Sequence, residues 1–175
     1  MVLEMDFTTT DPSYGWEELQ ARLAGSFTAQ TSGLVARDLS LSGPEGEFAR
    51  IKPRGLSGAD VVIGPLNSTI ERVGDARYQM ITDGTAMIAA SPAKRSADSL
   101  EMLIGGRFHE ARASYFLNRA AIHSPEGEEV ARLKGNLTGR RYEVVFDPET
   151  EGALLAAIFL LYHVVAHRNR AFRLG

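Results

Sequence analysis

The sequence predicts a mainly β protein: a closed antiparallel barrel of about twelve strands that encloses a hydrophobic C-terminal helix, with a short helix at the N-terminus. Three observations lead to this prediction. Residues 26–146 consist of short β-type runs, the run 153–166 has no polar stripe, and one motif occurs twice. We therefore expect residues 1–25 to be a lead-in with a helix, and residues 26–175 to be one barrel domain.

The N-terminal helix is predicted from the spacing of its apolar side chains. Trp16, Leu19 and Leu23 recur at helical intervals between Glu, Gln and Arg residues, and Gly25 is a stop signal. The polar face is acidic, whereas helices that lie on membranes are usually rich in Lys and Arg. We therefore expect this helix to pack on the domain. The first residues, Met-Val-Leu-Glu-Met-Asp, lack the basic region of a signal peptide.

The strands are predicted where Val, Ile, Leu, Phe, Tyr and Thr alternate with polar residues and the run stops at Gly, Pro, Asn or Asp. They are expected at 26–30, 34–41, 48–52, 59–63, 69–73, 76–82, 86–90, 100–104, 107–113, 115–122, 129–134 and 141–146. Gly105-Gly106 indicates a turn, and the loop 91–98 is the most flexible-looking segment.

The repeated motif indicates how the strands are organised. Residues 44–58 read PEGEFARIKPRGLSG, residues 125–139 read PEGEEVARLKGNLTG, and a weaker copy, DGTAMIAA, lies at 83–90. Each copy contains a Gly turn between two strands, as a hairpin requires. Hairpins that recur about every 40 residues favour an antiparallel sheet of stacked units. Closure removes its exposed edges, and a barrel of about twelve strands is too wide for strand side chains alone to fill.

The C-terminal run is the element that could fill this barrel. We predict a helix over about 149–167, with Asp147 as its cap, Pro148 in its first turn and cations over its last carbonyls. A helix that is apolar on all sides is enclosed by protein or spans a membrane. The fourteen residues 153–166 rise about 21 Å, whereas a span needs roughly 20 residues. The length favours a core helix.

Composition limits the classes of function. The 175 residues are 44% hydrophobic and 23% charged, with a formal net charge of −3. The chain is not basic overall, so its charge does not suggest a nucleic-acid partner. The absence of cysteine excludes disulfides, thiolate metal sites, a Cys nucleophile and palmitoylation. It also suits a reducing compartment, and we expect a cytoplasmic protein, with peripheral membrane attachment as a further hypothesis.

Two rows of cations stand out on the predicted strands. Arg50, Lys52 and Arg54 are spaced by two and would share one face, and Arg132 and Lys134 repeat this pattern in the second copy of the motif. Arg offers a bidentate fork and Lys a compact charge, and both suit phosphate. The structural alternative is that they are solvated side chains on an outer face, as most exposed cations are.

Several motifs resemble one known family. They are Tyr78-Gln-Met-Ile-Thr-Asp-Gly84, Ser124-Pro-Glu-Gly127 followed by Val130-Ala-Arg-Leu133, Tyr142-Glu-Val-Val-Phe-Asp-Pro148 and the Ala/Leu-rich run 153–166. In this order they resemble the tubby C-terminal-like superfamily, nearest to its phospholipid-scramblase and LURP-one-related branches. The resemblance covers roughly residues 26–170. It implies a twelve-stranded barrel threaded by a helix.

The resemblance also implies a function. Tubby domains bind phosphoinositide headgroups through a basic pair on a strand, which points first to Arg50 and Lys52. The chain lacks the cysteine-rich stretch of scramblases, and Asp147, Glu149 and Glu151 are better explained as a helix start than as a calcium site. We therefore do not expect lipid scrambling or calcium dependence.

The other candidate sites are weaker. Lys94-Arg95 and Arg140-Arg141 could extend a basic patch. His163 and His167 are four residues apart, as metal ligands can be, but no HExxH motif or third ligand accompanies them, which favours histidines at the barrel rim. No nucleophile elbow, P-loop or dinucleotide fingerprint is present. We expect no enzyme, cofactor or metal.

Three hypotheses for function follow. The first is a module that binds anionic phospholipid headgroups through Arg50, Lys52, Arg54, Arg132 and Lys134. The second is a structural or protein-interaction domain with no small ligand. The third, less favoured, is a membrane protein whose last helix inserts.

Overall fold

Twelve strands and two helices make up this computed structural model, which describes residues 12–32, 38–54, 57–63, 66–75, 77–93 and 99–173. The elements are α1 (Pro12–Leu23), β1 (Ser26–Ser32), β2 (Asp38–Gly43), β3 (Gly46–Pro53), β4 (Gly58–Ile63), β5 (Leu66–Gly74), β6 (Arg77–Thr82), β7 (Thr85–Pro92), β8 (Ser99–Ile104), β9 (Arg107–Ser114), β10 (Arg119–His123), β11 (Glu129–Gly135), β12 (Arg141–Phe146) and α2 (Ala153–Arg173).

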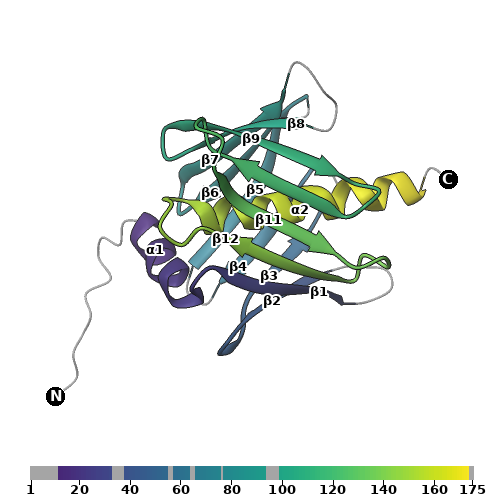
Figure 1. Ribbon diagram of the computed structural model, residues 1–175, viewed down its shortest axis with the longest axis horizontal. Coiled ribbons are helices and arrows are strands. Elements are labelled where there is room, and N and C mark those ends of the chain that lie inside the picture. Colours follow the sequence, from purple (N-terminus) through teal and green to yellow (C-terminus); the bar gives the residue numbers. More distant parts are fainter. Residues whose placement is uncertain are drawn as a thin grey trace.

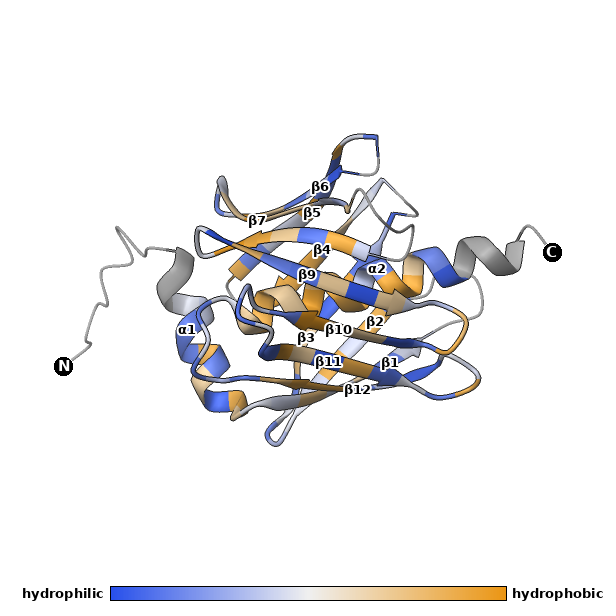
Figure 2. Cartoon of the chain, turned by 45° about the horizontal axis from the view of Figure 1, so that its top comes forward, coloured by the Kyte–Doolittle hydropathy of each residue, from blue (hydrophilic) through white to orange (hydrophobic). Residues whose placement is uncertain are grey.

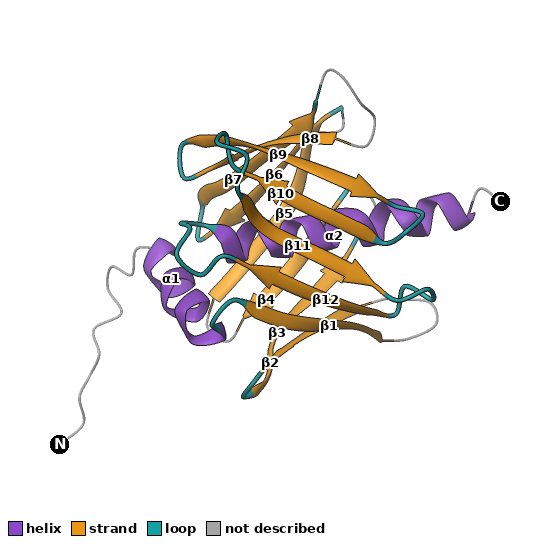
Figure 3. Ribbon diagram, in the orientation of Figure 1, coloured by secondary structure: helices purple, strands orange, loops and turns teal. Residues whose placement is uncertain are grey.

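The strands form a closed antiparallel barrel, as the sequence predicts. Each strand pairs with its neighbours in the chain, and β1 closes the ring on β12 with Phe27 opposite Val144 and Ala29 opposite Tyr142. Helix α1 lies against one end of the barrel, and the C-terminus of α2 leaves through the other (Figures 1 and 3). Closure leaves no unpaired strand edge among the described strands.

Helix α2 fills the barrel. Every residue from Ala153 to Val165 is buried, which confirms the prediction of an enclosed core helix. Strands alternate between buried and exposed residues, and the part of α2 inside the barrel is mostly hydrophobic (Figure 2). Tyr78 on β6 packs edge-on against Phe159 and Tyr162 of α2, with ring centroids 6.1 and 6.2 Å apart. Strand side chains and helix side chains therefore share a single core.

The three copies of the motif occupy equivalent places. They form the turns before β3, β7 and β11, which are every fourth strand of the ring. Each of these hairpins has a register shift at its turn end, at Leu41/Ser42, Met80/Ile81 and Ile122/His123. Bulges bend a strand and increase its twist. The barrel therefore has an approximate threefold repeat of hairpins, all at the α1 end.

Helix α1 is fixed to this end by hydrogen bonds of two buried side chains, Trp16 and Gln20. Trp16 donates from Nε1 to Thr82 Oγ1 over 3.2 Å, and Thr82 is hydrogen-bonded to Ser68 at 2.8 Å. Gln20 donates from Nε2 to the carbonyls of Pro148 (3.0 Å) and Thr150 (2.7 Å). Its Oε1 accepts the backbone N–H of Leu154 at 3.0 Å. One side chain of α1 thus caps the start of α2.

The predicted start of the C-terminal helix was wrong. Asp147 does not cap α2: its carboxylate accepts the Glu149 N–H (3.0 Å) and the Thr150 hydroxyl (2.8 Å), which closes a separate turn. Gly152, at φ +75°, then breaks the chain direction before the helix begins at Ala153. The helix also continues past the predicted end at 167, to Arg173.

One further boundary differs from the prediction. Residues 115–118 form a turn and not the start of a strand, because Asn118 adopts φ +53° and donates its N–H back to the Tyr115 carbonyl. Helix α1 ends at Leu23, just before the predicted stop signal Gly25. The remaining strands match within a few residues. Residues 1–11, 34–37 of one predicted strand, and Lys94 and Arg95 lie outside the described residues.

Candidate functional site

The first predicted basic row points outward as expected. Arg50 and Lys52 lie on the outer face of β3, and Ala49 and Ile51 are buried. Carboxylates neutralise much of this row. Arg50 donates from Nε and Nη2 to Glu47 at 3.1 and 3.3 Å, and Arg54, just past the strand, pairs with Asp60.

The second row, Arg132 and Lys134 on β11, also faces outward, and Ala131 and Leu133 are buried. These two cations line a groove of about 660 Å³ on the outer wall over β9 to β12. Arg112 of β9 and Arg119 of β10 line it as well. Among the described residues that line this groove, Glu143 is the one carboxylate.

Strand register explains why these cations converge. Ala121 lies directly between Arg112 on one side and Arg132 on the other. Arg119 lies between Ser114 and Lys134 in the next row. Neighbouring strands are about 4.8 Å apart, so the paired rows bring the backbones of Arg112 and Arg132 to within about 10 Å. The side chains of Ala121 and Ser114 are small, so the space between the surrounding cations stays open and forms the groove.

The cations of this groove differ in their partners. Arg112 donates from Nε to Glu110 at 2.8 Å, and Arg132 lies 3.5 Å from Glu129. Arg119 and Lys134 take part in none of the ion pairs of the described residues, although Glu143 is the register partner of Lys134. All four side chains are exposed. The groove therefore presents two arginines held in place by exposed carboxylates and two cations without such a partner.

The two predicted rows do not form one patch. Strands β2, β1 and β12 separate β3 from β11, so the rows lie roughly 19 Å apart along the wall. Sequence reasoning found Arg132 and Lys134 but not Arg112 and Arg119. Arg112 and Arg119 alternate with the buried Ala111 and Ala120, so the sequence alone indicates that they face outward. Their closeness to Arg132 and Lys134, however, depends on the register of three strands.

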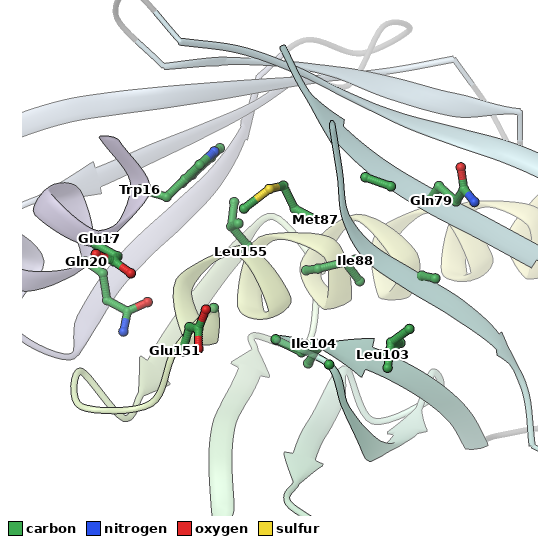
Figure 4. Close-up of a pocket in the computed structure, with 15 residues that line it drawn as sticks. Trp16, Glu17, Gln20, Gln79, Met87, Ile88, Leu103, Ile104, Glu151 and Leu155 are labelled. Carbon is green, nitrogen blue, oxygen red and sulfur yellow. The ribbon is translucent and has the colours of Figure 1, made fainter. Parts of the chain in front are cut away.

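A second pocket, of about 420 Å³, lies at the α1 end. In Figure 4 the side chains of Trp16, Met87 and Leu155 lie close together, with Gln20 and Glu151 on the side of α1. Its lining also includes Glu17 but no Lys or Arg among the residues that the structure describes. An apolar pocket with two carboxylates is unsuited to an anion, so the outer groove is the better candidate site.

The sequence predicts His163 at the barrel rim, but the structure places it inside the barrel. It is buried, and its Nε2 lies 2.8 Å from the Tyr115 hydroxyl. Burial, together with the nearby His167, lowers the pKa of His163 to about 3. A neutral imidazole in the core is a packing residue, and only the half-buried His167 approaches the surface. Among the described residues, no three His, Cys, Asp or Glu side chains are grouped to hold a metal ion.

Comparison with family models, curated proteins and solved structures found no match to this chain. Neither helix has an apolar stretch long enough to cross a bilayer within the part of the chain that the structure describes. The case for a function therefore rests on the geometry of the outer wall.

Proposed function

We propose that this protein is a non-enzymatic module that binds anionic phospholipid headgroups, phosphoinositides included, in the groove over β9 to β12. The observation that carries the proposal is the convergence of Arg112, Arg119, Arg132 and Lys134 on one hollow with a single carboxylate in its lining. Guanidinium groups bind phosphate oxygens in pairs, and the lysine adds a compact charge. The resemblance to tubby-like barrels supports the same class of ligand.

This proposal differs from the expectation based on resemblance alone. That expectation favoured Arg50 and Lys52, but the guanidinium of Arg50 is already engaged by Glu47 through two hydrogen bonds. A phosphate there would have to displace a carboxylate. On β3 only Lys52 lies outside the ion pairs of the described residues, whereas in the groove both Arg119 and Lys134 do, so a phosphate there can bind two cations without breaking an ion pair.

The test is liposome co-sedimentation with neutral, phosphatidylserine-containing and phosphoinositide-containing vesicles at two salt concentrations. Arg119→Ala with Lys134→Ala removes two groove cations. Arg50→Ala with Lys52→Ala removes the same charge from β3 and is the matched control. Each cation near an anionic surface contributes about 1 kcal/mol, so we expect the groove variant to bind about 30-fold more weakly and the control to change little.

Two results would contradict the proposal. A loss of binding in the β3 variant alone would move the site to Arg50 and Lys52. If the unmodified protein co-sediments with none of the vesicles at low salt, lipid binding is rejected and the protein-interaction domain is the better hypothesis. Binding that does not weaken with salt would also count against it, because exposed phosphate contacts are screened.

A further inference from the structure

Three exposed apolar side chains project from the barrel end where α2 emerges. Phe116 and Leu117, in the turn between β9 and β10, are 93% and 59% exposed. Leu137, in the turn between β11 and β12, is 97% exposed. Both turns lie at the end of the barrel from which the C-terminus of α2 leaves (Figures 1 and 3). We call these three residues the apolar tips.

The two turns are tied to each other. Asn118 donates from Nδ2 to the Asn136 carbonyl at 2.9 Å, and its own carbonyl accepts the Gly135 N–H at 2.7 Å. Gly135 allows this approach, because a Cβ there would lie 2.8 Å from the Asn118 Cβ. The Asn136 Oδ1 accepts the N–H groups of Arg140 and Arg141 at 3.0 and 3.2 Å. The turns are thus held side by side.

Helix α2 supports both turns from inside. Arg168 donates from Nη2 to the Leu137 carbonyl at 2.9 Å. Tyr115 is hydrogen-bonded to His163 and stacks on the ring of His167, with centroids 5.1 Å apart. The backbone at both tips is therefore anchored to the core, and the outward direction of Phe116 and Leu137 is built into the fold. Because the two turns lie side by side, three large exposed apolar side chains gather on one part of the rim, and such a group marks an interaction surface.

The charged residues around the apolar tips indicate which kind of surface covers them. Arg119, Lys134, Arg140 and Arg141 flank the tips, are exposed, and belong to none of the ion pairs of the described residues. Exposed carboxylates also lie at the opposite end: Glu17, Glu18 and Glu128 belong to none of the ion pairs of the described residues, whereas Glu45, Glu47 and Glu126 are paired with Arg22, Arg50 and Arg107. An anionic surface would therefore attract the part of the rim that carries the tips. Apolar groups ringed by cations match a bilayer with anionic headgroups.

We propose that the apolar tips insert into the interfacial layer of an anionic membrane while the adjoining groove holds a headgroup. This inference rests on the proposed function and adds an orientation: the barrel axis points toward the membrane, with α1 farthest from it. Arg119 and Lys134 belong to both regions, because they line the groove and begin or end the strands that carry the tips. The headgroup and the tips therefore meet the same leaflet.

Tryptophan fluorescence tests the insertion. Leu137→Trp places a reporter at a tip, and Phe108→Trp places the matched control at an exposed position near the α1 end, where Phe108 is 59% exposed. The native Trp16 is buried and hydrogen-bonded to Thr82, so the unmodified protein gives its constant background. With phosphatidylserine vesicles that carry brominated acyl chains, we expect a blue shift and quenching for Leu137→Trp and neither for Phe108→Trp.

A second variant measures the contribution of the tips. Phe116→Ser with Leu117→Ser and Leu137→Ser should weaken binding to anionic vesicles about tenfold or more, because it removes apolar surface that insertion buries. Its binding should keep the salt dependence of the unmodified protein, whereas loss of the groove cations should reduce that dependence. Phe108→Ser is the control and should bind normally.

The outcomes separate this inference from the proposed function. Vesicle binding without any shift or quenching of Leu137→Trp would leave headgroup binding in place and reject insertion. No vesicle binding at all would reject both. A blue shift that grows with protein concentration in the absence of vesicles would assign the tips to contacts between copies of the chain, and insertion would again be rejected.

Discussion

The clearest stability prediction concerns Gln20, which joins the N-terminal helix to the start of α2. Gln20→Ala removes three hydrogen bonds: the two that Nε2 donates to the Pro148 and Thr150 carbonyls, and the one that Oε1 accepts from Leu154. Each contributes about 1 kcal/mol net, and an unpaired buried N–H at Leu154 adds its own desolvation cost. We expect the free energy of unfolding to fall by at least about 3 kcal/mol.

The assay is chemical and thermal unfolding followed by circular dichroism. For a chain of this size, a loss of about 3 kcal/mol lowers Tm by roughly 6–12 °C. Glu18→Ala, an exposed position on the same helix, is the control and should change Tm little. Gln20→Glu separates the roles, because a carboxylate can still accept from Leu154 but cannot donate to the two carbonyls. We expect it to be destabilised as well.

Hydrogen exchange gives a local readout of the same contact. The Leu154 amide of the Gln20→Ala variant should exchange faster than in the unmodified protein by more than the global loss of stability explains. If Gln20→Ala unfolds within about 0.5 kcal/mol of the unmodified protein and the Leu154 amide keeps its protection, then Gln20 does not cap α2 and the reasoning is wrong.

Three further predictions follow from the core and the turns. Ile158→Asp should prevent folding, because an unpaired charge inside the barrel is very costly, whereas Val62→Asp on the outer face of β4 should fold; circular dichroism of both variants decides this. The depressed pKa of His163 means that only the unfolded chain binds this proton between about pH 6.5 and pH 3, so stability is lost as the pH falls through that window. The loss should be about 2 kcal/mol by pH 5 and absent in His163→Gln, as measured by unfolding at pH 7 and pH 5. A Cβ at Gly58 (φ +144°) would collide with the Ile70 carbonyl, whereas one at Gly46 (φ +109°) meets open space, so Gly58→Ala should lower the unfolding free energy by about 2 kcal/mol more than Gly46→Ala. Equal losses for the two alanine variants would show that the collision at Gly58 has no cost.

Local pattern was enough to predict the fold but not the junction between the barrel and its helix. Alternation in β12 and the unbroken apolar run after Gly152 depend only on neighbouring residues, and both predictions were confirmed. Asp147-Pro148 is an equally good signal for a helix start, yet the structure uses it for a turn. The true cap, Gln20, is 134 residues away in the sequence, and no local rule points to it.

The candidate site shows the same division. Outward orientation of Arg132 and Lys134 follows from alternation along one strand, and the structure places them so. The ion pair that neutralises Arg50 could have been predicted from the sequence, because Glu47 precedes Arg50 by three residues. The groove itself could not, because it requires the pairing of Ala121 with both Arg112 and Arg132, and register between strands is a property of the folded sheet.

The position of α2 after the last strand affects the order of events during synthesis. All twelve strands leave the ribosome before the helix that fills the barrel. The ring closes only when β1, the first strand to be made, pairs with β12. Until then the inward faces of the strands have no partner in the core. Such partly made sheets expose apolar surface and strand edges, which favours aggregation and engagement by chaperones. The barrel and its helix are thus expected to form together, in one late step after β12 and α2 have been made.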